Sequence, residues 1–415
     1  MKVAVIGAGA SGLVSARECL RQDFEVVVFE ASQALGGVWV FNETAEDDPL
    51  GQSSSEPIHS SLYASLRTNI PRDLMAFSDY TFDSQGGGKD EWERFPHHTC
   101  VRDYLENFSD EYDVSACIRY SSKVTQVRPD GNLWRVSTED ASEKFDAVAV
   151  CNGHYAKPRI PSLSGLENFR GTLMHSHNYR RPGDITGPSV AIWGTAASGL
   201  DLTFELDADE IHWFGNAYVN RVHLDDKRTG YPTIDFIDDE GRIVAGEYVV
   251  KADTLLFCTG YQYDFPFLLD VPVKVEDGWV HPLYHDVIPT DLPSLGFIGL
   301  PFLIIPFPVF EIQAKWFTRQ LKGVFKLPSR PSMRRAVRDR RQILIGSGEL
   351  QRHFHRLGEQ QFNYFNQLAA ECGEPGLPEW FVQTWRDVGK LREQNLLGYK
   401  DVPFAVRGPT ICRYN

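Results

Sequence analysis

Two glycine-rich segments of one pattern constrain the fold of this 415-residue chain more than any other feature. They read GAGASG at 7–12 and GTAASG at 194–199, and each follows a short apolar run. An apolar run followed by such a segment predicts a strand, a tight turn and a helix whose first N–H groups face a pyrophosphate. Two such segments in one chain predict two dinucleotides, between which electrons can pass.

The first segment opens a β–α–β unit, with a helix expected near 11–22 and a second strand at 25–29. That strand is followed by Glu30, where a carboxylate can accept hydrogen bonds from a ribose hydroxyl group. Each glycine segment is also followed, further along the chain, by an apolar strand that ends in a similar turn, at 146–153 and at 253–260. The repetition predicts two related nucleotide-binding units.

We therefore expect an α/β fold with two Rossmann-like dinucleotide-binding domains, the smaller one inserted into the larger one. The smaller domain is expected at residues 166–285. The larger domain is expected at 1–165 and again at 286–415, where the chain ends in charged helices.

The formal net charge of −14 argues against a nucleic-acid or anionic-membrane surface, and we interpret the arginine-rich stretch 330–341 as a solvated helix face. The longest apolar stretch, 295–310, is interrupted by prolines and too short to cross a bilayer, so we expect a buried strand and loop there and no membrane anchor. Neither His281 with His285 nor His97 with His98 predicts a metal site. A homo-oligomer stays an open alternative.

The seven cysteines include no CxxC pair. This suits reduced thiols in a cytoplasmic protein, and a secreted protein whose leader has been removed is the alternative.

Several further motifs resemble those of the class B flavin-containing monooxygenases. The GGVW segment 36–39 after the ribose acid is similar to that of these enzymes and of their Baeyer–Villiger relatives. The sequence FRGTLMHSHNYR at 169–180 is similar to the identifying FxGxxxHxxxY motif, and Baeyer–Villiger enzymes typically carry Trp where Tyr179 stands. The resemblance covers roughly 1–320 and is greatest to the soluble branch of insects, plants and yeasts, which includes insect pyrrolizidine alkaloid N-oxygenases.

The resemblance implies FAD on the first glycine segment and NADPH on the second. The implied reaction passes hydride from NADPH to the flavin, forms a C4a-hydroperoxyflavin with O₂, and oxygenates a soft nucleophile. That substrate is a small apolar tertiary amine, such as an alkaloid, giving an N-oxide, or a thioether, giving an S-oxide. Because the flavin carries the chemistry, no acid–base or nucleophilic cluster is required. An apolar pocket lined from 303–310 would suit such substrates.

The same resemblance assigns site residues. Asn69 is the expected catalytic residue, beside the flavin and the nicotinamide, and its alternative is an amide that caps the turn before Pro71. Gln313 is expected at the flavin, with an ordinary helix-face residue as the alternative, and His175 is expected to be structural. The remaining residues expected to contact FAD are Gly7, Gly9, Ala10, Ser11, Gly12, Glu30, Gly37, Val38, Trp39, Arg67, Thr68 and Val124, and those expected to contact NADPH are Gly194, Ala196, Ser198, Gly199 and Arg221.

Two departures concern the nicotinamide nucleotide. Ala196 replaces the middle glycine, and no arginine stands near Asn216, where the family usually holds the 2′-phosphate. Arg221 is the nearest cation after the strand, followed by Lys227 and Arg228. We expect NADPH to be preferred over NADH by a smaller margin than full arginine recognition would give, with acceptance of NADH as the alternative.

Three other functions compete with this interpretation. A dinucleotide:disulfide reductase needs a cysteine pair that the chain lacks. A Baeyer–Villiger monooxygenase is disfavoured by Tyr179. A non-catalytic FAD-binding redox sensor is disfavoured by the intact motifs, and oxygen-dependent NADPH consumption stimulated by an amine or a sulfide would dismiss it.

Overall fold

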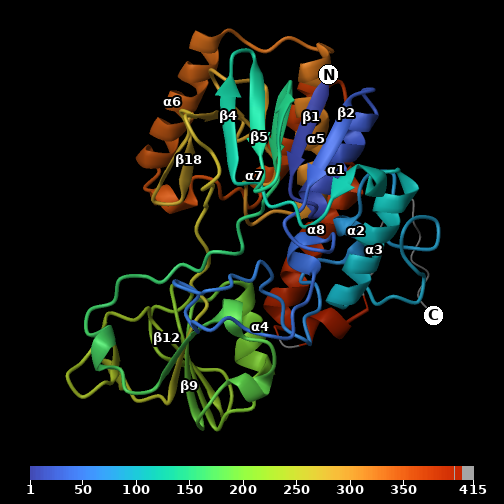
Figure 1. Cartoon of the computed structure of the whole chain (residues 1–415). Helices are drawn as coiled ribbons and strands as arrows, with labels where there is room; N and C mark the ends of the chain where they lie inside the picture. Colours follow the sequence, from blue (N-terminus) through green and yellow to red (C-terminus); the bar gives the residue numbers. More distant parts are fainter. Residues whose placement is uncertain (397, 404–415) are drawn as a thin grey trace. The chain divides into compact units, whose positions relative to one another are not determined.

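The computed structural model describes residues 1–396 and 398–403, so Cys412 lies outside the described residues. The chain forms two compact units (Figure 1). The first unit contains Met1–Val40, Arg67–Gly153 and Tyr263–Asn415, and the second unit contains Phe41–Leu66 and His154–Gln262.

A five-stranded parallel sheet forms the centre of the first unit, in the order β21-β7-β1-β2-β3. Its strands alternate between two buried faces, as the period of two along a strand requires. Val3 and Val5 face helices α1 and α5, whereas Ala4 and Ile6 face a small antiparallel sheet, β4-β5-β6. The strands and the two helices span β1 Lys2–Ile6, β2 Glu25–Phe29, β3 Ile118–Arg119, β4 Gln126–Asp130, β5 Leu133–Ser137, β6 Ser142–Phe145, β7 Ala147–Val150, β21 Leu295–Phe297, α1 Ala10–Leu20 and α5 Pro306–Lys322.

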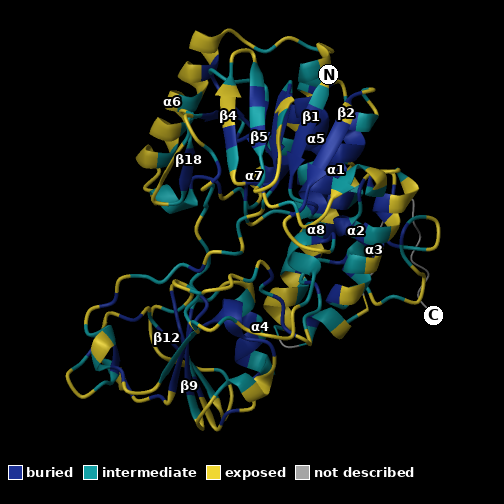
Figure 2. Ribbon diagram, in the orientation of Figure 1, coloured by how far each residue is buried: buried dark blue, intermediate teal, exposed yellow. Residues whose placement is uncertain are grey.

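The rest of the first unit is mainly helical. Figure 2 shows much of α1 and β2 as buried and most of α6 as exposed. Met333 is the buried residue of α6, which confirms the expected solvated helix face. The additional elements are α2 Arg72–Met75, α3 His98–Glu111, β17 Lys274–Glu276, β18 Trp279–His281, β19 Leu283–Tyr284, β20 Ile288–Pro289, α6 Arg330–Gly346, α7 Gln360–Cys372 and α8 Glu379–Gln394.

The second unit repeats the arrangement around its own glycine segment. Its six-stranded sheet has the order β11-β12-β10-β9-β16-β8, in which β11 pairs antiparallel with β12 and the other pairs are parallel. A second, three-stranded sheet has the order β13-β14-β15. The elements are β8 Thr172–His175, β9 Ser189–Trp193, α4 Ala197–Glu205, β10 Glu210–Phe214, β11 Val222–His223, β12 Arg228–Tyr231, β13 Phe236–Ile237, β14 Ile243–Ala245, β15 Tyr248–Val250 and β16 Thr254–Phe257.

The two units differ at their edges from the expected domains. Residues 263–285, expected in the smaller domain, belong to the first unit, because Phe267 is buried beside Phe29 and its carbonyl accepts a 2.7 Å hydrogen bond from the N–H of Val127. Residues 41–66 and 154–165, expected in the larger domain, belong to the second unit. The apolar stretch 295–310 is a strand and a loop as far as Ile305, but α5 then begins at Pro306, since proline is well accommodated at the first helical position.

Within the described part of the chain, no helix combines the length and the apolarity that a membrane span requires. The same residues contain no group of three or more histidine, cysteine or acidic side chains placed to hold a metal ion.

Candidate cofactor and active sites

The first glycine segment forms a tight turn between β1 and α1. Gly7 has a φ of +103°, and a Cβ atom on Gly12 would lie 1.9 Å from the carbonyl oxygen of Gly7. Both positions therefore exclude any side chain. Helix α1 begins at Ala10 with no side-chain cap at Gly9, so the N–H groups of its first turn remain for a ligand.

The middle glycine of the turn behaves differently. A Cβ atom on Gly9 would lie 3.5 Å from the Cα of Gly37, which is an ordinary contact, and its φ of −77° suits any residue. The protein fold alone thus does not require glycine at this position. A pyrophosphate that approaches the protein backbone closely at this point would require glycine.

The GGVW segment lies against this turn. The N–H of Gly36 donates to the carbonyl of Ala8 at 2.9 Å, and Gly37, at φ +58°, comes so close to Gly9 that an added Cβ would lie 2.9 Å from its Cα. Val38 and Trp39 follow in a short 3₁₀ turn and are half-buried. The two glycines therefore let the loop at 36–39 pack directly against the first glycine turn.

Glu30 lies at the carboxyl end of β2, next to the glycine turn. Its carboxylate accepts hydrogen bonds from the N–H of Ala8 and from the N–H and hydroxyl of Ser32, each at 2.8 Å. A carboxylate has about four acceptor positions, so one remains for a ribose hydroxyl group. The turn, the uncapped helix and this acid together fit a dinucleotide. Val124, in contrast, packs its side chain into the core beside Phe29.

The segment around Asn69 is fixed by its neighbours. The N–H of Thr68 donates to the carbonyl of Pro96 at 2.9 Å, and its hydroxyl donates across the turn to the carbonyl of Ile70 at 2.8 Å. The guanidinium of Arg67 bonds the carbonyl of Phe95 and pairs with Asp401 at 2.6 Å, so its observed contacts are structural.

The side-chain amide of Asn69 makes no hydrogen bond within residues 1–396 and 398–403, and the residue is half-buried. Thr68, rather than Asn69, closes the turn. The alternative of a turn-capping asparagine is therefore not what the structure shows. The amide is left to donate and accept toward a bound molecule.

Gln313 is fully buried inside α5 and does not face an open site. Its Oε1 accepts from the N–H of Gly299 at 2.8 Å, and its Nε2 donates to the hydroxyl of Tyr364 at 2.6 Å. With an exposed fraction of 0%, the side chain offers no surface to a flavin in this arrangement. The expected flavin contact is corrected to a structural link between α5, the loop at Gly299 and α7.

The second glycine segment repeats the geometry of the first. Gly194 has a φ of +132°, and a Cβ atom on Gly199 would lie 1.9 Å from the Gly194 carbonyl oxygen, which also accepts a 2.8 Å bond from the indole of Trp213. Helix α4 likewise begins without a side-chain cap, and Ser198 is half-buried in its first turn. Ala196 is exposed and has an ordinary φ of −85°, so the methyl group that replaces glycine is accommodated by the fold.

The three candidate cations for a 2′-phosphate have different surroundings. Lys227 pairs with Asp207 at 3.0 Å, and Arg228 bonds the carbonyl of Thr203 and the carboxylate of Asp225. Arg221 is exposed and has no ion-pair partner in the described residues, and its guanidinium lies 5.6 Å from the ring centre of Tyr248.

Arg221 also lies near the carboxyl ends of strands β10 and β12 of the six-stranded sheet. Tyr248 contacts Tyr231, whose carbonyl accepts a hydrogen bond from Gly215, the residue that follows β10. Of the three candidates, Arg221 is therefore the one that has no ion-pair partner among the described residues, and it lies near the strand ends that face the glycine turn.

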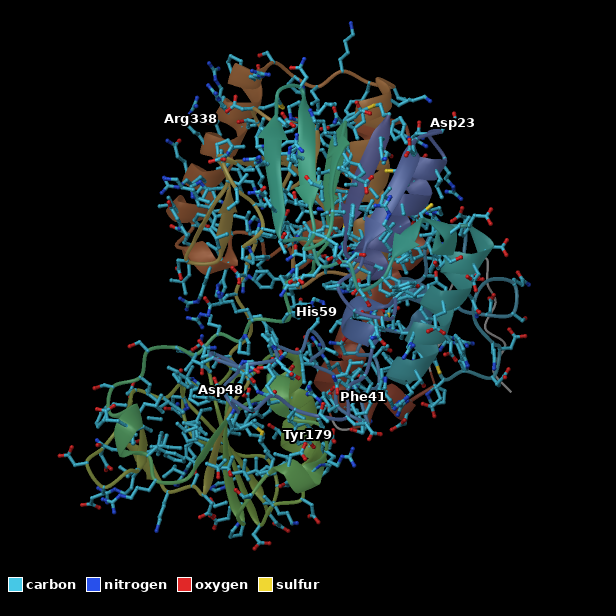
Figure 3. All side chains as sticks on the ribbon, viewed as in Figure 1. Asp23, Phe41, Asp48, His59, Tyr179 and Arg338 are labelled. Atoms are coloured by element: carbon cyan, nitrogen blue, oxygen red, sulfur yellow. The ribbon has the colours of Figure 1, made fainter. Side chains whose placement is uncertain are left out.

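The residues of the 169–180 motif hold the chain segment 41–66 inside the second unit. The amide of Asn178 donates to the carbonyl of Asp48, the N–H of His175 donates to that of Pro49, and the ring of Tyr179 packs edge-on against Tyr63. Figure 3 labels Asp48 and Tyr179. The motif is thus a clamp built from backbone and aromatic contacts.

His175 itself is structural, as expected. Its Nδ1 accepts from the N–H of His177 at 3.0 Å, so Nε2 carries the proton and donates to the carbonyl of Gly260 at 3.1 Å. Burial lowers the pKa of His175 to about 3, which keeps the ring neutral at physiological pH.

The cysteines described by the structure are all free thiols. Burial raises the pKa of the Cys151 thiol, under the first glycine turn, to about 12. The described residues contain no disulfide.

Comparison with known proteins identifies the class. The model of the flavin-binding monooxygenase-like family matches residues 1–233 and 234–387. The flavin-containing monooxygenase FMO GS-OX-like 2 of Arabidopsis thaliana is 40% identical over 92% of this chain and 87% of its own length, and FMO GS-OX5 of the same plant is 38% identical over the same shares.

Solved structures agree with this. The S-allyl-L-cysteine S-oxygenase of Allium sativum is 38% identical and superimposes with a TM-score of 0.91 over 97% of this chain and 95% of that one. Tmm of a Pelagibacter strain, at 23% identity and a TM-score of 0.83 over 98% and 94% of the two chains, shares the fold. These relatives give no support to the insect branch in particular. The matched family model, the plant relatives and the paired glycine turns together show that this chain belongs to the flavin-binding monooxygenase-like family.

Proposed function

We propose that this flavin monooxygenase, which uses FAD and NADPH, transfers one oxygen atom to the sulfur of a small thioether. The balanced reaction converts thioether, O₂, NADPH and H⁺ to S-oxide, NADP⁺ and water. The observation that carries the choice of sulfur is the similarity, over nearly the whole of both chains, to an enzyme described as an S-oxygenase. A tertiary amine is the alternative substrate.

The protein's contribution is to bind and orient the two nucleotides. We assign FAD to the first unit, with its pyrophosphate at the uncapped N-terminus of α1 and a ribose hydroxyl at Glu30. We assign NADPH to the second unit, at the matching N-terminus of α4. When bound, the flavin accepts hydride and activates O₂.

Asn69 is the residue we assign to the reacting end of the flavin. Its amide has no partner among residues 1–396 and 398–403, and it does not titrate, so it can donate and accept a hydrogen bond without leaking a proton. The bonds of Thr68 on either side fix its main chain. The residue therefore combines a rigid backbone with a free amide, as a positioned active-site donor requires.

Product analysis tests the proposal directly. Purified enzyme with NADPH in air should convert a thioether such as methyl phenyl sulfide to a product heavier by 16 mass units, with one NADPH consumed for each S-oxide formed. Incubation with ¹⁸O₂ should move that product by two further mass units. An N-oxide from a tertiary amine such as trimethylamine, without any S-oxide, would overturn the sulfur assignment, and oxygen-independent NADPH oxidation would overturn the monooxygenase assignment.

The role of Arg221 is tested by comparing the two nicotinamide nucleotides. Arg221→Ala is expected to raise the KM for NADPH about tenfold, because it removes a charge-assisted bond to the 2′-phosphate, and to leave the KM for NADH almost unchanged. Steady-state rates with both nucleotides measure this. Lys227→Ala is the matched control, since Lys227 is paired with Asp207. An equal change for NADPH and NADH would show that the 2′-phosphate is held elsewhere.

A further inference from the structure

Leu303 has a backbone conformation that its side chain does not favour. Eight non-glycine residues of the described chain have a positive φ, and seven of them are aspartate, serine or histidine. Short polar side chains tolerate this region because they can bond to the local backbone, whereas an aliphatic side chain gains nothing from it. Leu303, at a φ of +54°, is the single aliphatic member of the set.

The main chain around Leu303 is fixed by three backbone hydrogen bonds. The N–H of Phe302 donates to the carbonyl of His355 at 3.1 Å, and the carbonyls of Phe302 and Leu303 accept from Leu357 and Gly358 at 3.2 and 3.0 Å. None of these bonds involves the leucine side chain. The strained conformation is therefore imposed by the surrounding backbone, and a residue better suited to it would keep all three bonds.

The side chain of Leu303 contributes little to the core. It is 62% exposed, whereas Ile305, two residues later, is 1% exposed. One of its methyl groups lies beside Gly358, where an added Cβ would be 3.8 Å from it. A large apolar side chain that is both exposed and strained indicates a contact that the protein alone does not provide.

The position of the residue indicates which contact this is. Leu303 follows β21, whose carboxyl end lies at the same sheet edge as those of β1 and β7. Ile70, the residue after Asn69, packs against the buried cluster that contains Ile305. The chain segments that contain Leu303 and Asn69 thus both reach one small cluster within the first unit, through Ile305 and Ile70.

We propose that Leu303 is a specificity-determining residue, whose isobutyl group contacts the apolar substituent on the substrate sulfur. The inference rests on the proposed thioether oxygenation. It replaces the broader expectation of a pocket lined by 303–310, because Phe307, Pro308 and Val309 are buried within α5.

The test uses two substitutions that suit a positive φ, Leu303→Asn and Leu303→Gly, in the full FAD-loaded enzyme. The kcat/KM for methyl octyl sulfide should fall about tenfold or more, mainly through KM, because one apolar contact is lost. The kcat/KM for 2-(methylthio)ethanol, which lacks an apolar chain, should change less than about twofold. Tm and FAD content should stay the same or rise, since backbone strain is relieved.

Leu350→Asn is the matched control, because Leu350 is also exposed, at 47%, but has an ordinary φ of −69°. Its kcat/KM values should equal those of the wild type. Equal losses for the two sulfides, no loss for either, or a lower Tm with loss of FAD in both Leu303 variants would each overturn the inference. A wild-type enzyme that forms no S-oxide from either sulfide would instead overturn the proposed function.

Discussion

Replacing Gly199 by alanine is expected to abolish reduction of the flavin by NADPH while the protein stays yellow. The new methyl carbon would lie 1.9 Å from the carbonyl oxygen of Gly194, a backbone atom that cannot rotate away as a side chain can. The glycine turn must then move away from α4, which disperses the N–H groups that we assign to the NADPH pyrophosphate. The rate of flavin reduction at a fixed NADPH concentration should fall at least about a hundredfold, which corresponds to about 3 kcal/mol of binding.

Stopped-flow absorbance of the flavin measures that rate, and reduction by dithionite shows that the flavin itself remains competent. Gly183→Ala is the matched control in the second unit, because an added Cβ there meets no atom within 4 Å. We expect wild-type reduction in that variant. Normal NADPH reduction in Gly199→Ala would mean that the nucleotide does not bind at this turn.

Replacing Asn69 by leucine is expected to separate oxygen consumption from product formation. Leucine has a similar size but offers no hydrogen bond, so the proposed positioned donor at the reacting end of the flavin is lost. Loss of one such donor typically costs about a hundredfold. NADPH oxidation should continue, the S-oxide formed per NADPH should fall at least about tenfold, and the missing oxygen should appear as H₂O₂, which a peroxidase assay measures.

Asn363→Leu provides the control for the chemical change itself, because Asn363 is an exposed asparagine of α7 in the same unit. Its coupling of NADPH to product should match that of the wild type. Unchanged coupling in Asn69→Leu would remove Asn69 from the active site. A parallel loss of FAD would show that the residue acts on folding, and the flavin absorbance of each variant reports this.

The glycine turns could be predicted from the sequence because their geometry is local. A strand, a glycine-containing turn and a helix occupy fewer than twenty consecutive residues in each unit, and the observed bounds of α1 and β2 agree closely with those expected. Asn69 was singled out by resemblance, with a turn-capping role as the alternative. That its amide is free could not be predicted locally, because either Asn69 or Thr68 could have closed the turn, and the structure shows that Thr68 bonds to Ile70.

Gln313 illustrates what the sequence could not predict. Whether a polar residue of an amphipathic helix faces a ligand or the interior depends on its partners, here Gly299 and Tyr364, which lie 14 and 51 positions away. The expected boundary of the second unit differs from the observed one for a similar reason. Residues 41–66 contain no helix or strand, so no periodicity shows that they belong to it.

The clamp between residues 41–66 and the 169–180 motif has a consequence for the order in which the molecule is made. Glu46 lies 131 positions before His177, its partner at 3.2 Å. During synthesis this segment therefore leaves the ribosome long before the residues that bind it exist, and it stays without its native contacts until the motif has emerged. The second unit cannot be completed from one continuous stretch of chain. Its folding depends on a segment that is synthesised early and stays unpaired until the motif emerges. Slow translation between the two regions would therefore lengthen the time for which Leu62 and Tyr63, both buried in the folded protein, are exposed to solvent.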